Sequence, residues 1–251
     1  MTDTDSSQFY TGLVAELYEP LAGDLASAEP IKRFVTKYGT PALELACGGG
    51  HPMLALLADG LEVHGIDSSQ DMLDLCLRKA AAQNIDEPTV VRQRMQELSL
   101  PHRYACCYLA GASFCLMENI DDARAALSAV HEHLHPGGAF LVSLFRPEIV
   151  PQPSPAKERT ADDGATIAVQ LIAQQEHKDS QTIATTLRYT RERKEKELEV
   201  VDRVWRTRWY TVAEMHGLLG ATGFEIHRCT TYEGAPVEDH ATNFTVIALR
   251  A

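Results

Sequence analysis

The sequence predicts an α/β protein, built on a doubly wound parallel sheet that carries a small antiparallel β insertion. Between residues 42 and 145, short apolar runs alternate with amphipathic stretches of helical period, as in successive βαβ units. A glycine-rich turn follows the first apolar run, and an aspartate ends the second. Beyond a proline-rich stretch, three longer segments alternate apolar and polar residues with the period of strands.

The α/β elements follow one another in chain order. Strands are predicted at 42–46, 62–66, 89–92, 104–110 and 139–145, and the helices between them at 51–60, 70–83 and about 121–134. Ser68, with Asp71 three residues later, is typical of the N-terminal cap of a helix. The run His135-Pro136-Gly137-Gly138 predicts the end of the third helix.

The insertion interrupts this alternation. Four prolines between 147 and 155 permit neither a helix nor a central strand, and strands are then predicted at about 166–175, 182–193 and 198–209. Thr211 and Glu214 form a capping box for a helix ending at Gly223, and strands at 225–230 and 243–249 complete the sheet. We therefore divide the chain into an N-terminal helical cap (1–40), an α/β domain (41–146 and 210–251) and a proline-rich lid with the β insertion (147–209).

Composition excludes several classes of protein. Apolar residues make up 45% and charged residues 23% of the 251 residues, which is typical of a globular chain. The 23 Lys and Arg against 35 Asp and Glu leave a net charge of −12, which disfavours nucleic acid as a partner. No apolar run of about 18 residues indicates a membrane span, and the polar start of the chain does not resemble a signal peptide, so we expect a cytoplasmic protein. We expect no metal site, because the histidines at 131, 133 and 135 are interpreted as solvated side chains.

The glycine turn carries the chemistry. A turn between the first strand and helix, with Asp67 17 residues beyond Gly50, is typical of a site where an acid accepts hydrogen bonds from ribose hydroxyls. The turn reads Ala46-Cys47-Gly48-Gly49-Gly50-His51 and lacks two glycines of the dinucleotide fingerprint G-x-G-x-x-G. Glu44 places a carboxylate near the bound ligand, which suits the cationic amino-acid end of S-adenosylmethionine better than phosphates.

Four segments together resemble the class I S-adenosylmethionine-dependent methyltransferases. Residues 44–50 resemble their E/D-x-G-x-G-x-G motif, and Gly65-Ile66-Asp67-Ser68-Ser69 with Met72-Leu73 resembles the continuation G-x-D-x-S-x-x-M-L. Residues 134–138 are similar to the L-x-P-G-G turn, and Tyr210 through Glu225 to the segment near the C-terminus of the family. The resemblance implies a Rossmann-like methyltransferase sheet with an antiparallel last strand.

The resemblance also implies site residues. Glu44 would meet the methionine ammonium, Asp67 the ribose, and Tyr10 the cofactor carboxylate. The implied cofactor-binding set is Tyr10, Glu44, Ala46, Cys47, Gly48, Asp67, Ser68, Met72, Met95, Gln96 and Ala110. Ala46 replaces a motif glycine, which is tolerable if the backbone there is extended. Arg94 stands where relatives have an acid and has only donors, so we expect Gln96 or a backbone carbonyl to contact the adenine amine.

The leading hypothesis is a methyltransferase that acts on an N or O atom of a small molecule, with Tyr18, Arg146 and His240 as candidate catalytic residues. One alternative is a non-catalytic module that binds S-adenosylmethionine or S-adenosylhomocysteine, because no general base is evident. The other is a NAD(P)-dependent oxidoreductase, which the missing third glycine disfavours. The insertion is interpreted as a pocket wall or as a contact in a homodimer.

Overall fold

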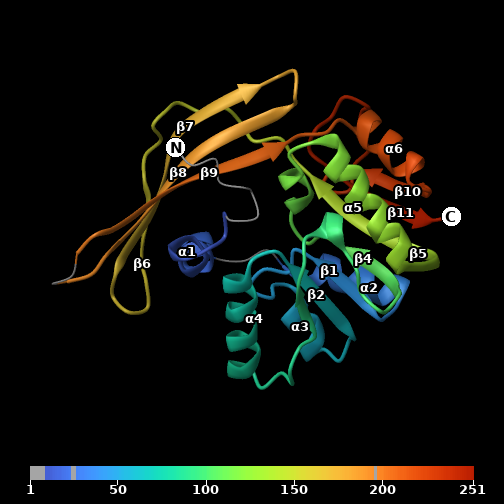
Figure 1. Ribbon diagram of the computed structural model, residues 1–251, viewed down its shortest axis with the longest axis horizontal. Coiled ribbons are helices and arrows are strands. Elements are labelled where there is room, and N and C mark those ends of the chain that lie inside the picture. The colour runs from blue at the N-terminus through green and yellow to red at the C-terminus, as the bar shows by residue number, and fades with distance from the viewer. Residues whose placement is uncertain (1–8, 24–26, 195–196) are drawn as a thin grey trace.

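The computed structural model describes residues 9–23, 27–194 and 197–251, which form two β-sheets and the helices around them (Figure 1). Sheet A has seven strands in the order β10-β11-β5-β4-β1-β2-β3, and sheet B has four in the order β6-β7-β8-β9. The strands of sheet A are β1 (Ala42–Leu45), β2 (Val63–Asp67), β3 (Val90–Arg92), β4 (Tyr104–Tyr108), β5 (Leu134–Leu144), β10 (Phe224–Thr230) and β11 (Phe244–Arg250). Those of sheet B are β6 (Lys157–Thr160), β7 (Thr166–His177), β8 (Thr182–Glu192) and β9 (Glu199–Arg208).

Sheet A has the predicted doubly wound topology. Strand β1 lies in the middle and pairs in parallel with β2 and β4, while β11 runs antiparallel to both β5 and β10. The carboxyl ends of β1, β2 and β4 therefore meet at one edge, where open α/β sheets bind their ligands. The predicted fold, including the antiparallel last strand, is confirmed.

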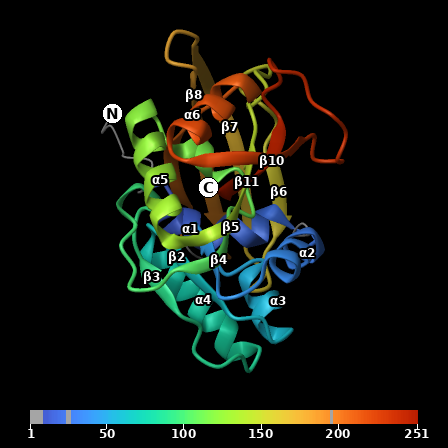
Figure 2. The ribbon, with the colours of Figure 1, turned by 90° about the vertical axis from the view of Figure 1, so that its right-hand side faces the viewer.

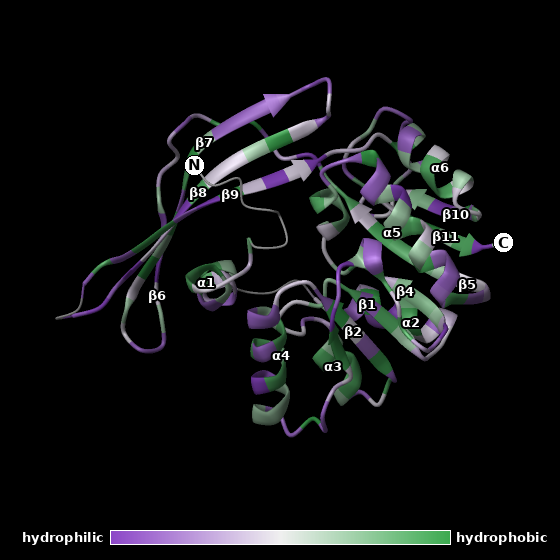
Figure 3. Ribbon diagram, in the orientation of Figure 1, coloured by the Kyte–Doolittle hydropathy of each residue, from purple (hydrophilic) through white to green (hydrophobic). Residues whose placement is uncertain are grey.

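Helices cover both faces of sheet A (Figure 2). On one face, α5 and α6 bury apolar residues against the sheet, and on the other α2, α3 and α4 do the same. Burial of these apolar side chains is the main favourable term for the fold. In Figure 3 the central strand β1 and helix α3 are largely hydrophobic, whereas the end of β7 is hydrophilic. The helices are α1 (Leu13–Ala22), α2 (Glu29–Tyr38), α3 (Met53–Ala58), α4 (Gln70–Ala82), α5 (Ile120–His133) and α6 (Val212–Ala221), with 3₁₀ turns η2 (Met95–Glu97) and η3 (Ser113–Leu116).

Sheet B corresponds to the predicted insertion, and the three predicted segments become β7, β8 and β9. The structure adds one strand that the sequence did not predict, β6, which pairs antiparallel with β7 along its edge. Sheet B forms a separate apolar cluster with helix α1, in which Val14, Leu17 and Leu21 pack against Ile167 and Tyr189. Helix α1 thus lies between sheet B and α4 (Figure 1).

Three local predictions are wrong. The cap of α4 is Ser69, whose Oγ accepts from the Met72 N–H, and not Ser68. Strand β5 begins at Leu134, so the Pro136-Gly137-Gly138 turn lies inside the strand at a register shift against β4. His133 is buried rather than solvated, because its Nε2 accepts from the Leu100 N–H at 3.0 Å and so links α5 to the segment after η2.

Candidate cofactor-binding site

A cavity of about 770 Å³ opens where β1, β2 and β3 end. The wall combines apolar side chains with a few polar ones from sheet A, from the start of α4 and from the N-terminal segment. It is formed by Tyr10, Tyr18, Ala46, Gly48, Ile66, Asp67, Ser68, Met72, Gln93, Arg94, Met95, Gln96, Ser113, Leu116 and Met117.

The glycine turn forms the floor of this cavity. Its backbone has positive φ at Ala46 (53°), Gly48 (52°) and Gly50 (87°), so that it curls tightly after β1. The Cys47 N–H donates to the Ile66 carbonyl at 2.9 Å and the Gly48 N–H to Asp67 Oδ2 at 2.8 Å. The condition of an extended backbone at Ala46 is not met, because this alanine lies in the left-handed region.

The strain at Ala46 gives a stability prediction. A left-handed conformation costs an L-residue about 1–2 kcal/mol, whereas the extra freedom of an unfolded glycine costs about 0.5–1 kcal/mol. We expect Ala46→Gly to raise the free energy of unfolding by about 0.5–1 kcal/mol, seen as a higher urea midpoint at an unchanged slope. Ala42→Gly, at a buried position in the preceding strand β1, should lower it. A lower midpoint for Ala46→Gly would contradict this assignment.

Asp67 ends β2 with its side chain at the cavity wall. Oδ1 accepts from the Ser69 N–H and Oδ2 from the Gly48 N–H, both at 2.8 Å. Burial raises the pKa of Asp67, and these backbone donors oppose that rise by stabilising the charged form. An ionised carboxylate has about four acceptor sites, so acceptor capacity remains for a hydroxylated ligand.

Two tyrosines of the N-terminal segment close the cavity. The rings of Tyr10 and Tyr18 pack edge to face with centroids 5.3 Å apart. Burial raises the pKa of both phenols, with neighbouring Tyr18 adding to the rise at Tyr10 and neighbouring Glu19 to the rise at Tyr18. Both side chains are therefore neutral at physiological pH.

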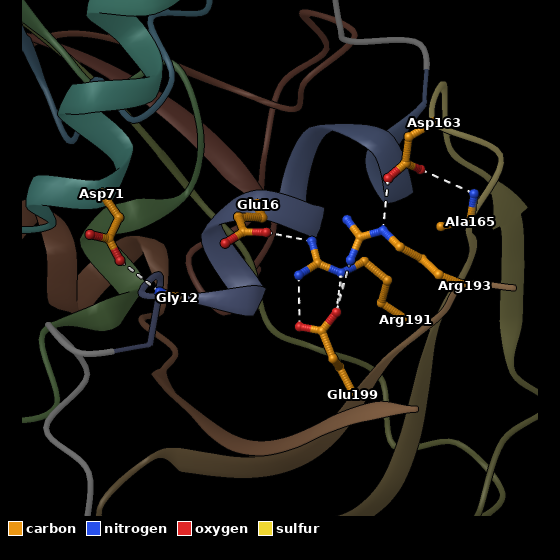
Figure 4. A network of polar contacts seen from close by, with 8 residues as sticks. All are labelled: Gly12, Glu16, Asp71, Asp163, Ala165, Arg191, Arg193 and Glu199. Carbon is orange, nitrogen blue, oxygen red and sulfur yellow. Dashed lines mark hydrogen bonds and ion pairs between the residues drawn. The ribbon is translucent and has the colours of Figure 1, made fainter. Parts of the chain in front are cut away.

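Polar contacts join this N-terminal segment to α4. Glu19 pairs with Lys79 at 2.6 Å, and the backbone N–H of Gly12 donates to Asp71 at 2.6 Å (Figure 4). The Ser69 hydroxyl donates to the Tyr10 carbonyl at 2.5 Å. The apolar contacts of α1 are with sheet B instead, so α1 belongs by packing to sheet B and only touches the α/β part.

Glu44 does not line the cavity. The side chain is buried in β1, where Oε2 accepts from the Tyr108 hydroxyl at 3.0 Å. Burial raises the pKa of Glu44 to about 8, although the hydrogen bonds from Tyr108 and from the Met53 backbone lower it. The predicted contact between Glu44 and a ligand ammonium stays a prediction.

Most of the predicted cofactor-binding residues converge on the cavity. Besides Glu44, two lie outside its wall: Cys47 is buried behind the turn, and Ala110 is exposed after β4. Sequence reasoning missed several wall residues, because η3 folds back over the site from a loop without a motif. The missed residues are Ile66, Gln93, Ser113, Leu116 and Met117.

The three candidate catalytic residues are not brought together. Tyr18 lines the cavity. Arg146 pairs instead with Glu176 of β7 at 2.6 Å, and its guanidinium lies 4.9 Å from the ring centre of Trp209. His240 is 84% exposed, pairs with Glu238 and does not line the cavity. Among the described residues, no group of three or more His, Cys, Asp or Glu side chains has the arrangement of a metal site.

A glycine turn, an acid at the end of β2 and an antiparallel last strand together define the methyltransferase type of α/β protein. Residues 42–138 match the methyltransferase domain family, which confirms the resemblance seen in the sequence. An uncharacterized methyltransferase of Synechocystis is 32% identical over 120 residues, which are 47% of this chain and 53% of the relative. The match thus spans about half the length of that relative.

Two further similarities come from enzymes with named substrates. The dTDP-3-amino-3,4,6-trideoxy-alpha-D-glucopyranose N,N-dimethyltransferase of Streptomyces venezuelae is 24% identical over 161 residues, 64% of each chain. The crystal structure of the sugar N-methyltransferase KedS8 from Streptoalloteichus superposes with a TM-score of 0.74 at 16% identity, covering 94% of this chain and 91% of that chain. At this level of identity the structural likeness shows the fold.

Proposed function

We propose that this protein is an S-adenosylmethionine-dependent methyltransferase that modifies an N or O atom of a small molecule. The observation that carries the proposal is the cavity in which the glycine turn and the Asp67 carboxylate lie side by side, within the matched residues 42–138. No described helix is long and apolar enough to cross a membrane. A homodimer and a cytoplasmic location stay predictions.

The residues of the cavity fit this cofactor. Asp67 retains acceptor sites for ribose hydroxyls, and Ile66 with Met72 offers apolar surface to a purine ring. Tyr10 and Tyr18 are neutral donors that can face a carboxylate. Glu44 is buried in β1, two residues before the glycine turn, and its carboxyl group is the one proposed to oppose the positive charge of the methionine ammonium.

On this scaffold, we expect catalysis to come mainly from holding the methyl donor and the acceptor in the geometry for direct displacement. When bound, S-adenosylmethionine supplies a methyl group on a positively charged sulfur, which is already activated for direct displacement. The chain's own contribution is to orient the acceptor, to exclude water with Tyr10, Tyr18 and sheet B, and to hold the reacting atoms in line.

The cavity favours an amine as the acceptor atom. A hydroxyl would require a base within hydrogen-bond reach, but in the described part of the wall the one carboxylate, Asp67, is held by backbone donors and there is no histidine. The tyrosines are neutral and do not serve as bases. A neutral amine needs no base for the attack and releases its proton to water afterwards. The named sugar N-methyltransferases make an amino sugar carried on a nucleoside diphosphate the first acceptor to test.

Calorimetric titration with S-adenosylmethionine, and separately with S-adenosylhomocysteine, tests the cofactor. We expect one-to-one binding of both, followed by transfer of a labelled methyl group to an amino sugar nucleotide. Binding without transfer to any amine or hydroxyl acceptor would favour the non-catalytic module. Binding of NAD(P) in place of either adenosyl ligand would favour the oxidoreductase.

A further inference from the structure

The face of sheet B that packs against α1, here called the inner face, carries two donors of interest on β9. Residues directly opposite on neighbouring strands share a face, and Arg203 pairs with Leu187 while Trp205 pairs with Thr185. Leu187 and Trp205 both pack in the apolar cluster with α1, which places Arg203 on this face as well. The inner face therefore looks toward the N-terminal segment that closes the cavity.

Neighbouring arginines of the β8–β9 hairpin are neutralised by carboxylates. Arg191 contacts both Glu16 and Glu199, and Arg193 contacts Asp163 and Glu199 (Figure 4). On the opposite face, Arg188 forms a two-point pair with Asp202 at 2.8 Å. These side chains bind within the protein and leave no charge for a ligand.

Arg203 differs from them. Among the described residues no carboxylate pairs with it, and its one hydrogen bond goes to the neighbouring Asp202 carbonyl at 3.2 Å. Its Nε is covered from solvent and has no acceptor. A covered donor without a partner loses its hydration without compensation, so a ligand oxygen at this position would restore a hydrogen bond.

Trp205 lies two residues along the strand from Arg203. Its indole Nε1 is covered from solvent and faces the Tyr10 hydroxyl, and this contact opposes the rise in the pKa of Tyr10. Two residues of a strand span about 6.7 Å, so both donors can reach oxygens of one ligand group. The indole ring lies 6.5 Å from the Phe9 ring and 5.8 Å from the Phe145 ring, and Phe9 in turn packs at 4.8 Å on Tyr10 of the cavity wall.

We propose that Arg203 and Trp205 bind a phosphate group of the methyl acceptor, with the acceptor lying across Tyr10 toward the cavity. This inference rests on the proposed function and adds the acceptor's anionic group to it. A guanidinium matches the oxygens of a phosphate in a two-point contact. A chain with a net charge of −12 repels a free anion overall, so an unpaired cation on the inner face supplies the local attraction that a phosphate group needs.

The test is calorimetric titration of the whole protein with thymidine diphosphate, run with and without saturating S-adenosylhomocysteine. We expect thymidine diphosphate to bind, and uncharged thymidine and succinate to bind at least tenfold more weakly. Arg203→Gln should weaken the binding at least tenfold and Trp205→Phe several-fold. Arg188→Gln, on the outer face of the same hairpin, should leave it unchanged.

Two readouts separate this site from a structural role and from the cofactor. Arg203→Gln should keep the thermal midpoint at or above that of the wild type, because it removes an uncompensated donor, and should keep the affinity for S-adenosylhomocysteine within twofold. Absence of thymidine diphosphate binding, or equal binding by Arg203→Gln, would overturn the phosphate site alone. Failure of the adenosyl ligand to bind would overturn the proposed function instead.

Discussion

Replacement of Asp67 by alanine should weaken binding of S-adenosylmethionine by at least about 100-fold. The change removes the charged acceptor proposed for two ribose hydroxyls, and hydrogen bonds to a charged group are each worth about 1.5–3 kcal/mol, with 1.4 kcal/mol for every tenfold in affinity. The carboxylate also holds the Gly48 and Ser69 N–H groups. We therefore expect a loss of about 1–3 kcal/mol in the free energy of unfolding as well, because these donors lose their acceptor.

Titration calorimetry and urea unfolding, performed on the same preparations, separate the two effects of Asp67→Ala. Asp74→Ala is a matched control, because this carboxylate of α4 accepts from Gln70 and does not line the cavity. The control should keep the wild-type affinity. If folded Asp67→Ala binds within twofold of the wild type, the ribose role of Asp67 is wrong.

Replacement of Glu44 by glutamine should change how stability depends on pH. The pKa of Glu44 is about 8 in the folded protein against an ordinary value of 4.5, so the folded state holds the proton more tightly than the unfolded state. Its contribution to stability is then fully present below pH 4.5 and is lost as the pH rises through 8. Glutamine stays neutral, so the variant should avoid this loss, which is on the order of 5 kcal/mol above pH 8.

Urea unfolding at pH 5, 7 and 9 measures the difference. The advantage of Glu44→Gln over the wild type should grow across this range. Glu62→Gln, at an exposed position before β2, is the control for loss of a surface carboxylate. A pH-independent difference for Glu44→Gln would show that burial does not raise the pKa of this carboxyl group in the folded protein.

The same group gives a binding signature. If Glu44 opposes a ligand ammonium, cofactor binding lowers its pKa and releases a proton near neutral pH. Calorimetry at pH 7 in two buffers of different ionisation enthalpy should then give different apparent enthalpies. The difference should vanish in Glu44→Gln.

The sequence was sufficient for the features whose signals are local. Apolar periodicity and the glycine turn predicted sheet A, and an acid at the end of a strand predicted where Asp67 lies. Ser69 and Ser68 are adjacent and chemically identical, so the sequence did not distinguish which of them caps α4. Three of the four residues of the short strand β6 are charged, so the sequence does not predict a strand there. Strand β6 forms because it pairs with the edge of β7.

The sequence did not predict the features of the site that depend on contacts between distant residues. The position of η3 in the cavity wall depends on how a motif-free loop packs after β4. Burial of Glu44 depends on Tyr108 in a neighbouring strand, and the pairing of Arg146 with Glu176 depends on where sheet B lies. Periodicity and spacing carry no information on such contacts, which tertiary packing decides.

The packing of α1 on sheet B has a consequence for the order of events during synthesis. The apolar partners of α1 lie about 150 residues or more further along the chain, so the helix emerges from the ribosome long before the surface that covers it exists. At a synthesis rate of about 5–20 residues per second, the apolar side of α1 stays uncovered for on the order of ten seconds or more. Closure of this long loop comes late, and the cavity that Tyr10 and Tyr18 complete is therefore finished only after most of the polypeptide has been made.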